Sequence, residues 1–313
     1  MEFRNLGRSG LQVSVVGVGC NNFGRRMDPA QTKAVVDRAI ELGINFFDTA
    51  NVYGPRGLSE EYLGQALQGR RHEVVIATKF GYEMGEGPME SGGSRKHIMD
   101  AVEASLRRLG TDYIDLYQMH GPDASTPIEE TLRALDDLVT QGKVRYIGHS
   151  NFAGWQAAEA HYLAQLRGYL PFVSAQNEYS LLDRRIEREL VPACEKYGVS
   201  ILPYFPLASG LLTGKYRQGE PPPEGTRLGA GGPLAARVLN DANFEVVGRL
   251  ETFAGEHGHT ILELAFGWLA SKPYIASVIA GATKPEQLDQ NVAAAEWRLT
   301  AEEMAEVDSL SRR

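Results

Sequence analysis

The sequence predicts a single (β/α)8 TIM barrel with an N-terminal β-hairpin plug and a long loop after the seventh strand. Short runs rich in β-branched and aromatic residues alternate with helical patterns eight times along the 313 residues. The runs are apolar on both faces, as parallel strands covered by helices should be. Polar side chains follow several early runs, and they would meet at the rim formed by the C-terminal ends of the strands.

The predicted strands are short and bounded by turn or helix signals. They are Val15–Gly19, Ile44–Asp48, Val74–Lys79, Tyr113–Gln118, Val144–Gly148, Phe172–Gln176, Ser200–Tyr204 and Ile275–Ile279. The length alone would allow two domains, but barrels with insertions reach this size as one. We therefore expect residues 1–313 to form one domain.

Local signals mark where several helices begin and end. Asp28-Pro29 places an N-cap before a proline at the first helical position, and Leu42-Gly43 ends that helix. Thr126-Pro127-Ile128-Glu129 predicts a capping box with proline at the first helical position, and Gly142 closes the helix. Within residues 94–110, apolar residues recur every four positions, which predicts one stripe facing the barrel.

Two segments do not fit the repeat. The opening Glu2–Ser14, with Gly7-Arg8-Ser9-Gly10 between extended runs, predicts a β-hairpin that plugs the N-terminal mouth of the barrel. Pro206–Asn240 is rich in glycine and proline and follows the seventh strand. A loop of this length is usually functional or disordered, and its position on the rim favours a flap over a cofactor or substrate.

Composition excludes some classes of partner. The formal net charge is −8, which argues against a nucleic acid or an anionic membrane as the main partner but leaves room for a local basic pocket. Residues 1–19 do not predict a secretory signal, and no run approaches the roughly 18 apolar residues that span a bilayer. Cys20 and Cys194 lack metal-ligand spacing. We expect a cytoplasmic protein with reduced thiols and no metal site.

Four polar residues lie at, or within one turn of, the C-terminal ends of early strands: Asp48, Tyr53, Lys79 and His120. Each has an ordinary structural explanation by itself, as a loop acceptor, a rim aromatic, a solvated cation or a satisfied histidine. Together they would place a carboxylate, a phenol, an ammonium and an imidazole on one rim. A phenol beside a cation is suited to protonate a carbonyl oxygen while the carbon is reduced.

Motifs along nearly the whole chain resemble the aldo-keto reductase family in order and spacing. They are Phe47-Asp48-Thr49-Ala50-Asn51-Val52-Tyr53-Gly54, Lys79, Gln118-Met119-His120, Gly148-His149-Ser150-Asn151-Phe152, Gln176 and Tyr204-Phe205-Pro206-Leu207. The likeness extends from the first hairpin to Asn291. It is closest to the bacterial and potassium-channel-β-like branches.

The resemblance implies reversible, NADPH-dependent reduction of an aldehyde or ketone to an alcohol. Tyr53 would be the general acid. A free phenol has a pKa near 10, and Lys79 would stabilise the phenolate and lower that pKa. Asp48 would hold Lys79 by an ion pair, and His120 would position the carbonyl and assist proton transfer.

The resemblance also implies the cofactor site. No G-x-G-x-x-G follows a strand, so a Rossmann site is not expected, and barrels instead bind phosphates with the loops after strands seven and eight. Ser150, Asn151 and Gln176 would bind the nicotinamide carboxamide, and Tyr204 would stack on the ring. The pyrophosphate segment would comprise Leu207, Ser209, Gly210 and Leu212, with Lys215 as a nearby charge.

The loop after the eighth strand departs from the best-known branch of the family. Gly281 and Gln287 stand where that branch has a lysine and an arginine that grip the adenosine 2′-phosphate. Lys284 would supply the charge instead, unless it is simply solvated, and Asn291 would meet the adenine. We expect NADP(H), with NAD(H) possible.

Two other classes of function remain open from the sequence. One is a nicotinamide-binding regulatory subunit with slow turnover, and the other is an unrelated barrel lyase or isomerase that uses Lys79 as a Schiff-base amine. The sequence leaves open the physiological carbonyl or alcohol substrate, the preferred direction and the oligomeric state. It also leaves open whether His149 is a core residue or lies near the nicotinamide.

Overall fold

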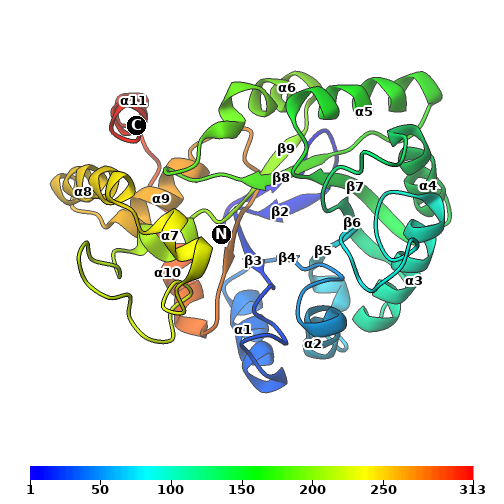
Figure 1. The fold of residues 1–313 in the computed structure, drawn as a ribbon, viewed down its shortest axis with the longest axis horizontal. Coiled ribbons are helices and arrows are strands. Elements are labelled where there is room, and N and C mark those ends of the chain that lie inside the picture. The colour runs from blue at the N-terminus through cyan, green and yellow to red at the C-terminus, as the bar shows by residue number, and fades with distance from the viewer. Residues whose placement is uncertain (313) are drawn as a thin grey trace.

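The computed structural model describes residues 1–312, and it confirms the (β/α)8 barrel with an N-terminal hairpin (Figure 1). The strands are β1 Phe3–Asn5, β2 Gln12–Ser14, β3 Val16–Gly19, β4 Phe46–Asp48, β5 Val75–Phe80, β6 Ile114–Met119, β7 Val144–Ser150, β8 Ser174–Glu178, β9 Ser200–Tyr204 and β10 Val278–Gly281. The helices are α1 Pro29–Glu41, α2 Leu58–Ala66, α3 Arg95–Leu109, α4 Ile128–Thr140, α5 Gly154–Arg167, α6 Leu190–Tyr197, α7 Gly232–Val238, α8 Asp241–Glu256, α9 Ile261–Ala270, α10 Pro285–Ala294 and α11 Ala301–Leu310.

The barrel sheet is parallel and nearly closed. Its order is β10-β3-β4-β5-β6-β7-β8-β9, so each strand lies beside its neighbour in sequence and β10 pairs with β3. A single parallel bridge between Ile201 and Ile275 joins the two remaining edges. The C-terminal ends of all eight strands therefore face one rim.

The hairpin plugs the opposite mouth, as predicted. β1 and β2 pair antiparallel, and the Gly7 amide donates to Ser200 Oγ at 2.8 Å. Leu6 and Val13 are fully buried in the inner core of the barrel, where they pack with residues such as Leu116 and Leu202. Burial of these two side chains anchors the start of the chain to the barrel.

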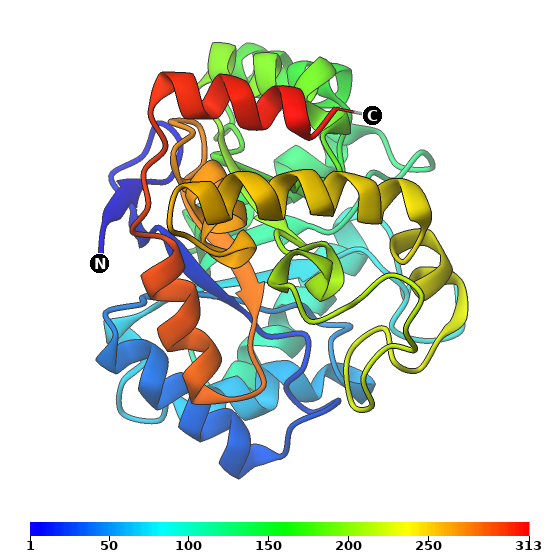
Figure 2. The ribbon, with the colours of Figure 1, turned by 90° about the vertical axis from the view of Figure 1, so that its left-hand side faces the viewer.

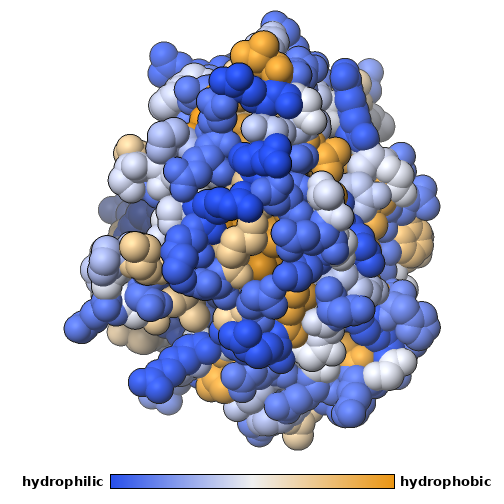
Figure 3. Space-filling view, turned by 90° about the vertical axis from the view of Figure 1, so that its right-hand side faces the viewer, coloured by the Kyte–Doolittle hydropathy of each residue, from blue (hydrophilic) through white to orange (hydrophobic). Residues whose placement is uncertain are grey.

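Helices surround the sheet and form the outer core. The buried residues of α4 include Leu132, Leu135 and Leu138, which form a single stripe against the barrel. The face on the α3 and α4 side is mostly hydrophilic, with scattered apolar residues (Figure 3). On the other side, α8 and α11 lie outside the repeat (Figure 2), and the Trp268 indole of α9 donates to Asp308 of α11 at 2.9 Å.

Two local expectations are corrected. The eighth strand is β10 rather than Ile275–Ile279, because the run divides between two neighbours: Ile275 pairs with Ile201, and pairing with β3 begins at Val278. The capping box at Thr126 is wrong, since its hydroxyl donates to Asp123 Oδ2 at 2.7 Å and α4 begins at Ile128. The N-cap at Asp28 is confirmed, and in the structure it is part of a capping box with Gln31.

The segment 206–240 is less irregular than predicted. It contains 3₁₀ turns over Ala208–Thr213 and the helix α7, which leaves residues 214–231 as its irregular part. Within residues 1–312, no helix combines the length and the apolarity needed to cross a bilayer.

Candidate functional site

Strands β4, β5 and β6 bring the four rim residues together. Asp48 ends β4, Lys79 lies near the end of β5, and His120 directly follows β6. Lys79 Nζ donates to Asp48 Oδ2 at 2.7 Å, to the Thr49 carbonyl at 2.7 Å and to the Tyr53 hydroxyl at 3.4 Å. The ammonium is fully buried, so the ion pair with Asp48 is what allows it to stay charged there.

Further donors hold the Asp48 carboxylate. Its Oδ1 accepts a hydrogen bond from Gln176 Nε2 at 2.8 Å and another from Gln118 Nε2 at 3.3 Å. Ser174 Oγ donates to Gln118 Oε1 at 3.2 Å and orients that amide. The Gln176 side-chain nitrogen therefore uses one N–H on Asp48, which leaves its second N–H and its oxygen for a ligand.

Burial changes the acidities at this cluster. Burial acts to lower the pKa of the Lys79 ammonium, but the Asp48 charge and the Tyr53 oxygen outweigh it and the pKa lies above its ordinary value. At Tyr53 the balance differs from our expectation. Burial raises the pKa of the phenol, and Lys79 offsets only part of that rise, so the pKa is higher than that of a free phenol rather than lower.

His120 is neutral at physiological pH. Burial, with the Lys79 charge, lowers the pKa of the imidazole to about 2. Its ring packs edge-on against Tyr53 with centroids 5.6 Å apart, and it stacks on Tyr82 at 4.1 Å. Within residues 1–312 its buried Nδ1 has no hydrogen-bond partner. Neutral His120 therefore offers one N–H donor and one acceptor nitrogen.

Asn151 connects three strands at the rim. It adopts a left-handed conformation (φ 62°) directly after β7. Its Nδ2 donates to the His120 carbonyl at 2.9 Å, and Tyr204 Oη donates to its Oδ1 at 2.9 Å. Ser150 Oγ donates to the Gln176 carbonyl at 2.7 Å. These bonds position the side chains predicted to meet the nicotinamide.

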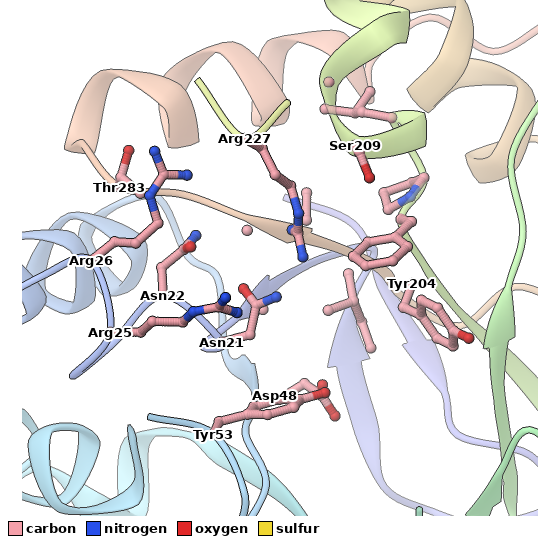
Figure 4. A pocket seen from close by; sticks show the side chains of 18 of the residues that line it. Asn21, Asn22, Arg25, Arg26, Asp48, Tyr53, Tyr204, Ser209, Arg227 and Thr283 are labelled. Carbon is pink, nitrogen blue, oxygen red and sulfur yellow. The ribbon is translucent and has the colours of Figure 1, made fainter. Parts of the chain in front are cut away.

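A cavity of about 1260 Å³ opens above this cluster (Figure 4). It exceeds the roughly 300–1,000 Å³ typical of sites for drug-sized ligands, so it can hold a dinucleotide. Asp48, Tyr53 and His120 line it. The predicted cofactor residues that line it are Ser150, Asn151, Gln176, Tyr204, Leu207, Ser209, Gly210, Lys215, Gly281, Lys284, Gln287 and Asn291.

Leu212 is the predicted cofactor residue that is absent from this wall. It is fully buried in the outer core. The reason is the path of the chain after β9, where Phe205, Ala208 and Ser209 all have positive φ (52°, 45° and 59°). Non-glycine residues in this conformation cost of order 1 kcal/mol each and persist where the surroundings enforce them. Here the tight path directs Ser209 into the cavity (Figure 4).

The donor set of the cavity fits a phosphate-bearing dinucleotide. It offers cations, hydroxyls and amides for phosphates and ribose, and the Tyr204 ring for stacking. Gln287 Oε1 accepts hydrogen bonds from the Thr283 and Lys284 amides at 2.7 and 3.3 Å, so Gln287 closes the first turn of α10. Lys284 is an exposed side chain on the same wall.

Sequence reasoning missed three arginines in the cavity: Arg25, Arg26 and Arg227. Arg227 lies over the Phe205 ring at 4.5 Å, and its pKa is lowered by burial and by the charges of Arg25 and Arg26. The adjacent pair of arginines after the first strand was the available signal. Those two arginines follow β3, outside the loops after strands seven and eight that usually bind phosphates in barrels, whereas Arg227 lies in the long segment after the seventh strand.

His149 is a core residue. Its ring stacks on Phe152 with centroids 4.6 Å apart and packs edge-on against Phe172 at 5.2 Å. Burial lowers the pKa of this imidazole to about 3. His149 is not among the residues that line the cavity. Residues 1–312 also contain no cluster of three acidic, histidine or cysteine side chains placed to hold a metal.

The fold and the site define a (β/α)8-barrel protein with a buried carboxylate–ammonium–phenol cluster beside a large polar cavity. The model of the Aldo/keto reductase family matches residues 15–312, and the chain belongs to that family.

Curated relatives match the chain over most of its length. A probable voltage-gated potassium channel subunit beta of Oryza sativa subsp. japonica is 40% identical over 94% of this chain and 91% of its own. The L-glyceraldehyde 3-phosphate reductase of Escherichia coli (strain K12) is 35% identical over 98% of this chain and 92% of its own. The versiconal hemiacetal acetate reductase of Aspergillus parasiticus is 35% identical, with coverage of 97% and 95%.

Proposed function

We propose that this protein reduces aldehydes or ketones to alcohols with NADPH, and that Tyr53 is the general acid. The observation that carries the proposal is the contact between the Tyr53 hydroxyl and Lys79 Nζ at 3.4 Å, at the base of a dinucleotide-sized cavity. Family membership supports an oxidoreductase, and two of the relatives are named as reductases of carbonyl compounds or their hemiacetals.

The side chains that line the cavity support an assignment of its parts to parts of the cofactor. NADPH, when bound, supplies the hydride that no side chain can donate. Lys215, Arg227 and the Ser209 hydroxyl are positioned to hold the pyrophosphate, and Lys284 supplies a cation for the 2′-phosphate. Tyr204 would stack on the nicotinamide, and Asn151 holds Tyr204 in place through the hydrogen bond between their side chains.

Tyr53 transfers its proton from Oη to the substrate oxygen as negative charge develops there. Lys79 then stabilises the phenolate, because its ammonium is fully buried and held by Asp48. Neutral His120, next to the Tyr53 ring, donates an N–H hydrogen bond to the carbonyl oxygen and orients it. Tyr82 stacks on His120 and limits its motion.

The test is the Tyr53→Phe variant, assayed by NADPH oxidation at 340 nm with a panel of aldehydes and ketones. Loss of a general acid typically lowers kcat about 10²- to 10⁴-fold. Quenching of tryptophan fluorescence by NADPH should persist, because the ring of Tyr53 is retained. Equal turnover by the variant and the native protein would exclude Tyr53 as the acid.

A second candidate is a nicotinamide-binding regulatory subunit with slow turnover. It is favoured by the 40% identity to a protein named as a probable potassium channel subunit beta. Single-turnover hydride transfer without steady-state turnover, together with a stable partner in a pull-down, would support it. The Schiff-base alternative has less support, because Lys79 is fully buried with Asp48, Thr49 and Tyr53 around its Nζ.

A further inference from the structure

We infer that Arg25 is a specificity-determining residue that binds an anionic group, a carboxylate or a phosphate, on the carbonyl substrate. The inference rests on the proposed function and names the substrate class of the same site. A guanidinium binds either anion through two parallel N–H···O bonds, so it selects for charge and for position.

The loop that carries Arg25 is packed against the segment that carries Tyr53. Gly24 has a positive φ of 70°, and a Cβ on it would come within 2.5 Å of Leu58 Cβ. A Cβ on Gly54, the residue after Tyr53, would lie 3.1 Å from the Phe23 carbonyl oxygen. These close approaches place Arg25 on the part of the cavity wall next to the proposed acid.

The Arg25 side chain has no acceptor of its own. Within residues 1–312 it forms no ion pair and no side-chain hydrogen bond, and it lines the cavity as an exposed residue. In Figure 4 its guanidinium extends from the left into the cavity beside Asn21, while Arg227 enters from above. A guanidinium held in a site without a counter-charge is ready to receive an anion.

The neighbouring arginines already have other contacts. Arg26 donates to the Gly225 carbonyl at 2.5 Å and so joins this loop to the irregular part of segment 206–240. Arg227 lies over the Phe205 ring at 4.5 Å. The acids that line the cavity are Asp48, which pairs with Lys79, and Glu224. An anion beside Arg25 therefore relieves repulsion among the three arginines.

The cofactor also carries phosphates, so an anionic group on the substrate must be distinguished from the phosphates of the cofactor. Phosphates bind in barrels at the loops after the seventh and eighth strands, here after β9 and β10. Lys215, Arg227 and Lys284 belong to those two loops, whereas Arg25 belongs to the loop after β3. Arg25 is thus available to the substrate while the other cations meet the dinucleotide.

The experiment compares pairs of aldehydes that differ in charge: succinic semialdehyde with butanal, and glyceraldehyde 3-phosphate with glyceraldehyde. For each pair, the ratio of kcat/KM, charged over neutral, is measured for the native protein, Arg25→Gln and Arg25→Lys. We expect Arg25→Gln to lower the ratio by about tenfold or more in at least one pair, as loss of a charge-assisted bond implies, and Arg25→Lys to restore part of it. The pair that responds identifies the anion.

Arg188→Gln is the matched control, since Arg188 is another exposed arginine that does not line the cavity. It should leave both ratios unchanged. A second readout does not need turnover: calorimetric titration of the NADPH-loaded protein with 4-hydroxybutyrate and with inorganic phosphate. We expect Arg25→Gln to weaken the binding of one of these two ligands about tenfold.

Three results would overturn the inference. The first is unchanged ratios in Arg25→Gln, and the second is anion binding in the calorimeter that does not depend on Arg25. The third is a parallel loss for charged and neutral aldehydes with weaker NADPH binding, which would assign Arg25 to the cofactor phosphates. Failure of the proposed function is distinguishable, because then the native protein oxidises NADPH with neither member of either pair.

Discussion

Two effects of opposite sign set the acidity of Tyr53. The sequence predicts that Lys79 lowers the pKa of the phenol, but burial raises it and the ammonium at 3.4 Å offsets only part of the rise. A phenol with a raised pKa is fully protonated at physiological pH. The proton that the proposed reduction needs is therefore present on Tyr53, and Lys79 makes its release less costly than burial alone would.

The first prediction concerns the pH dependence of reduction. Under the proposed function, reduction needs protonated Tyr53, so activity should be present below the pKa of the phenol and be lost only above it. His120, with a pKa of about 2, does not change its charge near neutrality. We expect kcat at saturating NADPH and substrate to be constant from about pH 6 to about pH 9. A change in kcat near the ordinary histidine pKa would show that a histidine proton takes part.

The second prediction concerns the buried ion pair. Lys79→Met leaves the Asp48 carboxylate buried without its counter-charge, and loss of one partner of such a pair typically costs about 3–5 kcal/mol. Urea unfolding at pH 7 should show this loss in the free energy of unfolding. The double variant with Asp48→Asn should recover part of it, because Gln118 and Gln176 can still hydrogen-bond the amide oxygen. A double variant less stable than the single one would contradict this account.

At the scale of elements, Asp123 stabilises the segment before α4, where the sequence predicts a capping box at Thr126. Its carboxylate accepts hydrogen bonds from the Ser125 amide and hydroxyl, the Thr126 hydroxyl and the Gly93 amide. It therefore joins the loop before α4 to the loop before α3. Burial acts to raise the pKa of Asp123, but these hydrogen bonds hold it well below its ordinary value.

The third prediction follows from the hydrogen bonds that Asp123 accepts. Asp123→Ala should lower the free energy of unfolding by about 1 kcal/mol at pH 7, the usual cost of a lost capping interaction. A carboxyl whose pKa is lower in the folded state stabilises above its unfolded pKa, and this contribution is lost as pH falls. The difference between native and variant should thus shrink below about pH 4. Denaturant melts at several pH values measure it, and a difference that grows in acid would refute the assignment.

At the scale of the whole molecule, residues from both halves of the barrel line the cavity. Its wall includes Asn21 after β3, Asn151 after β7 and Lys284 at the start of α10. A ligand that contacts all of these elements binds only the folded chain. Binding should consequently stabilise the whole fold rather than one loop.

The fourth prediction is a cofactor-dependent rise in melting temperature. NADPH at 100 times its Kd should stabilise the protein by about 2.7 kcal/mol and raise Tm by roughly 5 °C. NADH at the same concentration should do less, because it lacks the 2′-phosphate. Lys284→Ala should reduce the shift from NADPH while leaving the shift from NADH nearly intact. Equal shifts from the two cofactors in the native protein would remove the basis for the NADP(H) preference.

Features of the fold that depend on residues close together in the sequence could be predicted, whereas features that depend on contacts between distant segments could not. The barrel, the hairpin plug and the helix start at Asp28 follow from local patterns, and the structure confirms them. The sequence does not reveal that the eighth predicted strand, Ile275–Ile279, divides its pairing between β9 and β3, because this depends on which strands lie beside it in the folded barrel. The strand-end positions of Asp48, Lys79 and His120 followed from chain order, and the structure brings these residues together.

By itself, the sequence determined the alternation of strands and helices and the residue types delivered to the rim, because both depend on period and order along the chain. Only the tertiary structure decided the acidity of Tyr53, the neutral state of His120, the burial of Leu212 and the entry of Arg25 into the cavity. Each of these depends on which distant segments exclude water from a group or leave it exposed. Desolvation is a property of the packed molecule, and no local pattern records it.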